Sequence, residues 1–129
     1  MDLGRFPLAE FEQHLVNVAA GQGYESTHLL KYVGELSHPA SHVTIYLDRM
    51  RAIRQVIEVM IHPETATAVL GAIEAVHGLN IKSELCHNSN LRRFPKRLNK
   101  GAREISFARS VECADVTAFD RLLQTLAAS

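Results

Sequence analysis

Segments with two different spacings of apolar residues alternate along this chain. In some segments the apolar residues recur every three or four positions, and in others every second residue is apolar. The first spacing places side chains on one face of a helix, and the second places them on one face of a strand. The chain therefore predicts a mixture of helices and strands. Its 129 residues are about the size of one domain, so we expect a single α+β domain over residues 1–129.

Three segments have the helical spacing. The first begins at Pro7, whose missing N–H group suits the first position of a helix, and it ends at Gly21. The second runs from Pro63 to Gly78, and the third follows Asp115, which predicts an N-cap. We expect their buried faces to consist of Leu8, Phe11, Leu15 and Val18, then Val69, Leu70, Ile73 and Val76, and finally Val116, Phe119, Leu122, Leu123 and Leu126.

Four segments predict strands, namely residues 43–48, 55–61, 81–86 and 103–111. Residues 55–61 also fit a helical spacing. However, this run is rich in β-branched residues and ends at His62-Pro63, where the residue before proline favours an extended backbone. We therefore expect 43–48 and 55–61 to form an antiparallel hairpin across a basic turn.

Residues 24–36 remain open between a helical face and a short strand that ends at Gly34. Residues 37–41 contain Pro39 and predict a loop, and residues 87–102 have almost no periodicity and predict a longer one. The predicted order is thus helix, open segment, strand, strand, helix, strand, strand, helix. Hairpins separated by helices are typical of an antiparallel sheet, here of about four strands, with helices packed on one face.

Several protein classes are excluded by composition. The longest stretches without a charged residue have twelve residues, far short of the roughly 20 apolar residues of a membrane helix. Asp2 and Glu10 stand where a secretion signal would carry a basic and then an apolar run. Cys86 and Cys113 are the only cysteines, too few for a disulfide scaffold. We therefore expect a cytoplasmic protein with no membrane partner.

The balanced total charge hides an uneven distribution. Fourteen basic and fourteen acidic residues cancel over the whole chain. Residues 1–80 hold five basic and nine acidic residues, a net charge of 5 − 9 = −4, whereas residues 81–129 hold nine and five, a net charge of 9 − 5 = +4. Six of the basic residues lie between His87 and Arg103, where there is no carboxylate. This basic run is the most unusual local feature of the sequence.

The basic run predicts a site for an anionic partner, either a nucleic acid or an acidic protein. A connection of about sixteen residues between two strands is long for a compact domain, and such loops are usually functional or disordered. Basic side chains neutralise phosphates, and Phe94 offers a ring on which a base can stack. We expect anion binding by Arg92, Arg93, Lys96, Arg97, Lys100 and Arg103, with polar contacts from His87, Asn88 and Asn90.

Other interpretations stay open. The loop could be merely solvated, with its cations paired to acidic side chains of the first half at about 0 to 1 kcal/mol per exposed pair. It could instead dock onto another protein or onto a second copy of the chain, giving a regulatory module or a homodimer. A third hypothesis is a metal-dependent phosphoester hydrolase, with His87 as acid–base and Glu84 or Glu104 holding the metal.

Our leading hypothesis contains no catalytic residue, metal or cofactor. The chain has seven histidines. His38 and His42 are four apart, but Pro39 makes a helix carrying both improbable. Cys86 and His87 are adjacent, and successive strand residues point to opposite faces, so they are awkward joint ligands. We therefore expect a small non-enzymatic binding protein that presents residues 87–103 to its partner.

A resemblance rests on the same segment. His87-Asn88-Ser89-Asn90, then Arg93 to Arg97 (RFPKR), then Gly101 and Glu104-Ile105, followed by a strand and a helix, resembles the C-terminal signature of a family of small bacterial cytoplasmic proteins without an established activity. Ile61-His62-Pro63 is similar to the middle of that family. The resemblance covers roughly the last two-thirds of the chain and not residues 1–40. It implies an α+β fold, a cytoplasmic setting and a hairpin instead of a helix at 49–61, and it carries over no catalytic residue. Related segments beside nucleic-acid-acting modules are a hint by association only.

Overall fold

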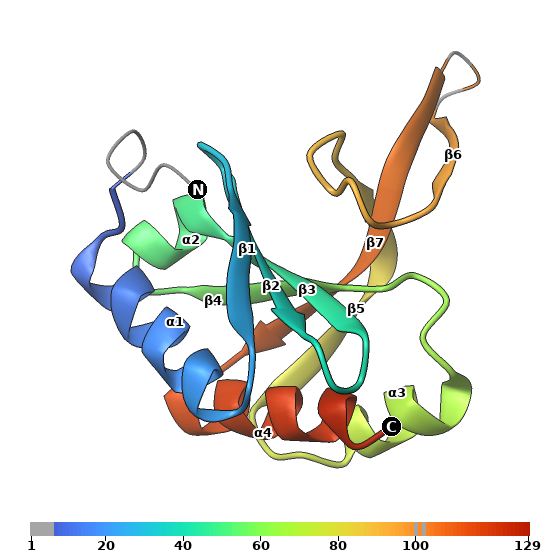
Figure 1. Cartoon of the computed structure of the whole chain (residues 1–129). Coiled ribbons are helices and arrows are strands. Elements are labelled where there is room, and N and C mark those ends of the chain that lie inside the picture. The colour runs from blue at the N-terminus through green and yellow to red at the C-terminus, as the bar shows by residue number, and fades with distance from the viewer. Residues whose placement is uncertain (1–6, 100, 102) are drawn as a thin grey trace.

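The computed structural model describes residues 7–99, 101 and 103–129, and all statements below concern these residues. They form four helices and seven strands (Figure 1). In chain order the elements are α1 (Glu10–Gly21), β1 (Glu25–Leu29), β2 (Val33–His38), β3 (Val43–Asp48), α2 (Arg49–Ile53), β4 (Ile57–Ile61), α3 (Thr67–Glu74), β5 (Leu79–His87), β6 (Lys96–Asn99), β7 (Arg103–Cys113) and α4 (Val116–Ala127).

The strands form one antiparallel sheet in the order β1-β2-β3-β4-β7-β5. β7 is the longest strand, and its two ends have different partners. Its inner end, Arg109–Cys113, pairs with β4, whereas its outer end, Arg103–Ser106, pairs with β6. The outer end of β7 and β6 together form a two-stranded ribbon that projects away from the helices (Figure 1). The α+β class is confirmed, but the predicted number of four strands is wrong.

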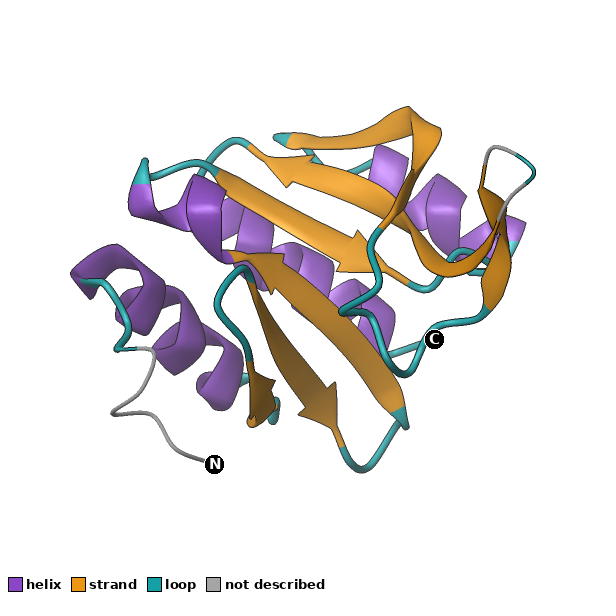
Figure 2. Cartoon of the chain, turned by 90° about the horizontal axis from the view of Figure 1, so that it is seen from above, coloured by secondary structure: helices purple, strands orange, loops and turns teal. Residues whose placement is uncertain are grey.

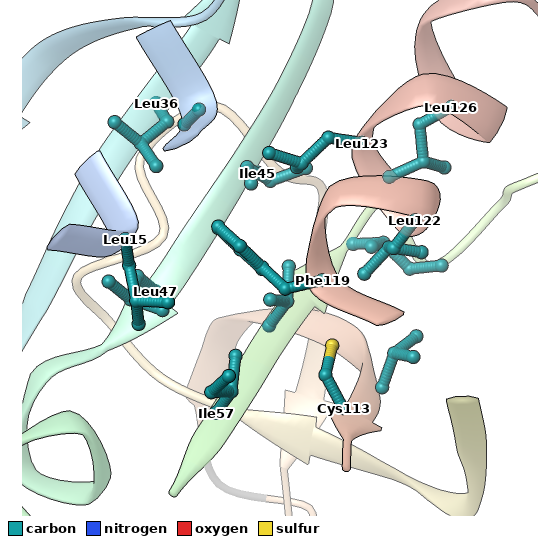
Figure 3. Close-up of a cluster of buried hydrophobic side chains, with 14 of the residues drawn as sticks. Leu15, Leu36, Ile45, Leu47, Ile57, Cys113, Phe119, Leu122, Leu123 and Leu126 are labelled. Atoms are coloured by element: carbon teal, nitrogen blue, oxygen red, sulfur yellow. The ribbon is translucent and has the colours of Figure 1, made fainter. Parts of the chain in front are cut away.

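The helices pack on one face of the sheet, as predicted. Figure 1 shows α1, α3 and α4 along this face, and Figure 2 shows strands in front of part of the helical layer. Ile45 and Leu47 of β3 point into the core beneath the helices, where Phe119 of α4 is fully buried (Figure 3). Each such side chain contributes about 1.5 to 3 kcal/mol through burial. The predicted face of the last helix is also confirmed, since Phe119, Leu122, Leu123 and Leu126 are all buried.

A second, smaller core lies on the opposite face of the sheet. Strand residues alternate between the two faces, so Tyr46 and Met60 point away from the helices. They are covered by Leu91 and Phe94, which come from the segment between β5 and β6. The rings of Tyr46 and Phe94 meet edge to face, with centroids 4.9 Å apart. Part of the basic segment is therefore held firmly against the sheet.

Two of the predicted helices begin later than expected. α1 begins at Glu10 instead of Pro7, and the Glu12 carboxylate accepts a hydrogen bond from the N–H of Ala9, the N-cap residue. α3 begins at Thr67 instead of Pro63, because a turn intervenes in which the Thr65 N–H donates to the His62 carbonyl at 3.1 Å. Asp115 caps α4 as predicted, since its carboxylate accepts a hydrogen bond from the Ala118 N–H at 2.8 Å.

The strand predictions are correct in the middle of the chain and incomplete around it. The hairpin of β3 and β4 is confirmed, with Tyr46 opposite Met60, although α2 occupies the turn. The open segment 24–36 holds β1 and most of β2, and Gly34 lies inside β2 instead of ending a strand. The predicted loop at 87–102 is correct for residues 88–95 and wrong at residues 87 and 96–99, because residue 87 belongs to β5 and residues 96–99 form β6.

Candidate anion-binding surface

The basic run divides into two structural parts. Residues 88–95, which we call the anchored segment, lie on the second core, where Leu91 is fully buried. This segment is built from tight turns, and the Asn88 side chain accepts a hydrogen bond from the Asn90 N–H at 2.9 Å. The second part, which we call the basic ribbon, comprises β6 (residues 96–99) and residues 103–106 of β7. The two parts place their cations in different environments.

Arg92 of the anchored segment is paired with a buried carboxylate on β2. Its Nε and Nη2 atoms donate to Glu35 at 3.1 and 2.9 Å, and Glu35 also accepts hydrogen bonds from the hydroxyls of Tyr46 and Thr27, each at 2.7 Å. Burial by itself raises the pKa of Glu35, but the hydrogen bonds from Arg92, Tyr46 and Thr27 outweigh it and lower the pKa from 4.5 to about 2. Glu35 is therefore ionised at neutral pH.

Arg93 shares the same carboxylate. Its Nε atom lies 3.6 Å from Glu35, its Nη1 atom donates to the Ser37 hydroxyl at 3.4 Å, and its backbone N–H donates to the Tyr46 hydroxyl at 3.0 Å. Two arginines thus face one carboxylate and leave a net charge of 2 − 1 = +1. Both side chains remain nearly half exposed, at 48% for Arg92 and 47% for Arg93. The predicted cluster of six freely displayed cations is therefore only partly present, because Arg92 and Arg93 are engaged.

The cations of the basic ribbon have no acidic partner among the described residues. Arg97 donates from Nε to the His87 ring at 3.0 Å and lies over the ring of Phe107, 4.6 Å from its centroid. Lys96 and Arg103 are exposed and form no ion pair within the described part of the chain. Lys100, the remaining predicted anion-binding residue, lies outside the described residues.

Strand register gives the basic ribbon two different faces. Arg97 lies opposite Ile105 and Asn99 lies opposite Arg103, so these residues share one face with the two arginines on it. The other face carries Lys96, together with Leu98 opposite Glu104. Leu98 is 63% exposed on this second face.

The carboxylates proposed for a metal site do not come together. Glu84 is next to Leu85, which pairs with Arg109, whereas Glu104 is five residues from Arg109 toward the far end of β7. At about 3.4 Å per residue the two positions are roughly 17 Å apart along the sheet. Although β5 and β7 pair, Glu84 and Glu104 are therefore too far apart to hold one metal ion together. No group of three or more His, Cys, Asp or Glu side chains that could hold a metal ion occurs within residues 7–99, 101 and 103–129.

The two cysteines lie in different surroundings. Cys86 is partly buried beside the second core, and Cys113 is buried in the first. Burial raises the pKa of the Cys113 thiol to about 12, so this thiol is protonated at neutral pH and unreactive as a nucleophile.

Glu35 and Tyr46 are the residues of this site that sequence reasoning missed. Glu35 stands between Gly34 and Leu36 in a segment without a clear period, and its partner Arg92 is 57 positions away. Once the segment is known to be a strand, Val33, Glu35 and Ser37 must share one face because they are two residues apart, but the sequence itself does not identify the strand.

No helix of the described part of the chain is both long enough and apolar enough to cross a lipid bilayer. No protein-family model, curated protein or solved structure matches this chain. The family resemblance of the basic run therefore stays a prediction.

Proposed function

We propose that this protein binds nucleic acid through its basic ribbon, as a binding module without chemistry of its own. The observation that supports the proposal is the contrast between the two parts of the basic run. Arg92 and Arg93 face the Glu35 carboxylate, whereas Lys96, Arg97 and Arg103 have no acidic partner among the described residues. Cations left without a carboxylate partner are available to replace the counterions of a phosphate backbone.

The shape of the ribbon supports the same function. A two-stranded antiparallel ribbon fits the major groove of B-form DNA, which is about 12 Å wide. β6 and the outer end of β7 form such a ribbon, and it stands clear of the helices (Figure 1). The face with Arg97, Asn99 and Arg103 offers two guanidinium groups for phosphates or guanine edges and an amide for adenine edges. Lys96, on the other face, is placed for a flanking phosphate.

The affinity for a 20-base-pair DNA duplex, measured by fluorescence anisotropy over a range of salt concentrations, tests this proposal. Three phosphate contacts predict that log K falls with log salt at a slope of about −3, since each contact contributes about −0.9. The triple variant Lys96→Ala/Arg97→Ala/Arg103→Ala should lose most of the affinity and most of this slope. Absence of binding by the natural chain at low salt would refute the proposal.

A matched control removes the same charge elsewhere. Lys31, Arg54 and Arg121 are exposed and form no ion pair within the described residues. The variant Lys31→Ala/Arg54→Ala/Arg121→Ala therefore has the same net charge as the ribbon variant. If both variants lose affinity equally, the binding reflects total charge, and the assignment to the ribbon is wrong.

A second candidate is self-association through β6, favoured by the exposed Leu98. Within the described residues β6 pairs only with β7, so its other edge is open to a strand of a second copy. Sedimentation velocity over a concentration series distinguishes the two candidates. A dimer that Leu98→Asp abolishes, together with no DNA binding, would favour this second function.

A further inference from the structure

An open cavity of about 400 Å³ is lined in part by Arg93 and Phe94 of the anchored segment and by no described residue of the basic ribbon. It is bordered by the start of β3, the end of β4, the turn before α3, the end of α4 and the anchored segment. Its volume falls within the range of about 300 to 1,000 Å³ that is typical of sites for small organic ligands. The cavity plays no part in the proposed contact with nucleic acid.

Most of the cavity wall is apolar. The side chains that form this wall come from both strands, both helices and the anchored segment, namely Val43, Ile45, Ile61, Val69, Phe94 and Leu126. A surface of this kind favours a hydrocarbon chain or ring over a fully polar ligand, because the apolar area that leaves water contributes about 25 cal/mol per Å².

The polar side chains that line the cavity all carry hydrogen-bond donors, namely the hydroxyls of Thr44, Thr65 and Ser129, the imidazoles of His42 and His62, and the guanidinium of Arg93. Ser129 is also the last residue of the sequence, and its carboxylate forms no ion pair with another described residue. The Arg93 side chain is nearly half exposed. The His62 Nδ1 atom accepts a hydrogen bond from the Glu64 N–H at 3.0 Å, so a neutral His62 ring carries its proton on Nε2 and offers a donor there. No aspartate or glutamate side chain is among the residues that line the cavity.

The charge balance at Arg93 itself also favours an anion. The only ion pair that Arg93, His42 or His62 makes with another described residue is the contact of Arg93 with Glu35. Because Arg92 already occupies that carboxylate with two hydrogen bonds, the group of Arg92, Arg93 and Glu35 keeps a net charge of +1. A carboxylate or phosphate bound at Arg93 would neutralise the remaining positive charge of this group.

The start of α3 adds to the positive electrostatic potential at the cavity. Ala66, the N-cap of α3, and Val69 in the first turn both line the cavity, and no side chain caps this helix. The first turn of a helix has N–H groups without partners inside the helix and carries a partial positive charge. The cavity thus combines an apolar wall with an arginine, two imidazoles and an uncapped helix start.

We propose that this cavity binds a small organic carboxylate with an apolar body. The carboxylate would lie at the rim against Arg93 and the imidazole donors, and the hydrocarbon part would lie against the wall formed by Val69, Phe94 and their neighbours. An arginine guanidinium matches a carboxylate with two parallel hydrogen bonds, which an isolated lysine could not supply.

Three eight-carbon probes that differ only in the head group test the charge requirement. Octanoate, octan-1-ol and octylammonium are titrated below their micelle concentrations, with two-dimensional amide NMR as the readout. We expect octanoate to bind at least tenfold more tightly than octan-1-ol, octylammonium not to bind, and the shifts to centre on residues 43–45, 61–69 and 93–94. Equal binding of all three probes, no binding at millimolar concentrations, or shifts centred elsewhere would overturn the proposal.

Two variants locate the head group and the body of the ligand. Arg93→Gln keeps the backbone N–H that donates to Tyr46, and it should weaken octanoate about tenfold while leaving octan-1-ol unchanged. Val69→Trp should fill the cavity and abolish binding of both probes, with circular dichroism reporting that the fold is kept. The control Arg97→Gln, on the ribbon, should leave octanoate binding unchanged. If Arg97→Gln weakens octanoate as much as Arg93→Gln, the cavity is not the site.

Discussion

The carboxylate of Glu35 and the guanidinium of Arg92 form two hydrogen bonds, at 3.1 and 2.9 Å, between residues 57 positions apart. This pair attaches the anchored segment to β2 at the same place where Phe94 packs on Tyr46. Glu35 is fully buried, whereas the Arg92 side chain is about half exposed. The pair therefore holds a basic segment on the sheet and still leaves one side of the guanidinium at the surface.

We predict that Glu35→Gln destabilises the fold by about 2 to 3 kcal/mol, because the buried hydrogen bonds of a carboxylate with Arg92 and Tyr46 are weakened together. Denaturant unfolding measures this change. Glu84→Gln is the matched control, since Glu84 is exposed and makes no ion pair with another described residue, and it should change the stability by less than about 0.5 kcal/mol. Equal stability of both variants would show that Glu35 is not part of a stabilising network.

The pKa of Glu35 predicts an acid-sensitive part of the stability. The carboxylate titrates near 4.5 when unfolded and at about 2 when folded, so its contribution is complete above pH 4.5 and is lost as the pH falls from 4.5 toward 2. A pKa lowered from 4.5 to about 2 corresponds to about 3 kcal/mol. Unfolding free energies measured from pH 6 to pH 2 should show this loss in the natural chain and not in Glu35→Gln. Parallel pH profiles of the two proteins would contradict the assignment.

The elements that the sequence predicted well carry their signal locally. α4 has both a capping carboxylate at Asp115 and an apolar face that repeats through Phe119 and Leu123, so neither tertiary contacts nor partners were needed to identify it. The β3–β4 hairpin was also recognisable, because the apolar residues of β3 alternate, β4 is rich in β-branched residues, and β4 ends at His62-Pro63. The helix α2, which forms the turn of this hairpin, is only five residues long, so its sequence shows almost no helical periodicity.

The elements that could not be predicted from the sequence depend on partners that are far away along the chain. β6 has one apolar residue, Leu98, which faces solvent, and the strand exists because it pairs with the outer end of β7. Residues 24–36 remain open between helix and strand in the sequence because the turn between β1 and β2 at Lys31-Tyr32 contains no glycine, proline or asparagine, which are the usual turn residues. The late start of α3 follows from the hydrogen-bonded turn after His62, which proline alone does not predict.

Truncation of two leucines of the basic run should have very different effects on the stability of the fold. Leu91 is fully buried in the second core, so Leu91→Ala should cost about 2 to 5 kcal/mol, through lost burial and the cavity that remains. Leu98 is 63% exposed on the ribbon, so Leu98→Ala should change the stability by less than about 0.5 kcal/mol. Thermal or denaturant unfolding of both variants checks this. A small effect of Leu91→Ala would mean that the anchored segment is not packed on the sheet.

The buried pair of Glu12 and Arg49 joins α1 to α2. We predict that mutations of these two residues have non-additive effects on the stability of the fold. Their side chains are 2% and 6% exposed, and Arg49 donates to Glu12 at 2.5 and 3.1 Å and to the Leu30 carbonyl at 2.6 Å. Glu12→Leu removes the carboxylate that accepts two hydrogen bonds from the buried Arg49 guanidinium and should cost about 3 to 5 kcal/mol.

The double variant Glu12→Leu/Arg49→Met removes both buried charges and should be more stable than Glu12→Leu alone, because apolar side chains of similar volume carry no desolvation penalty. We expect the double variant to recover only part of the lost stability, since the Leu30 carbonyl loses its donor in every variant that lacks Arg49. Urea unfolding of the natural chain, both single variants and the double variant gives the coupling energy between the two residues. Strictly additive effects would show that Glu12 and Arg49 contribute independently, in contradiction to the bidentate contact between α1 and α2.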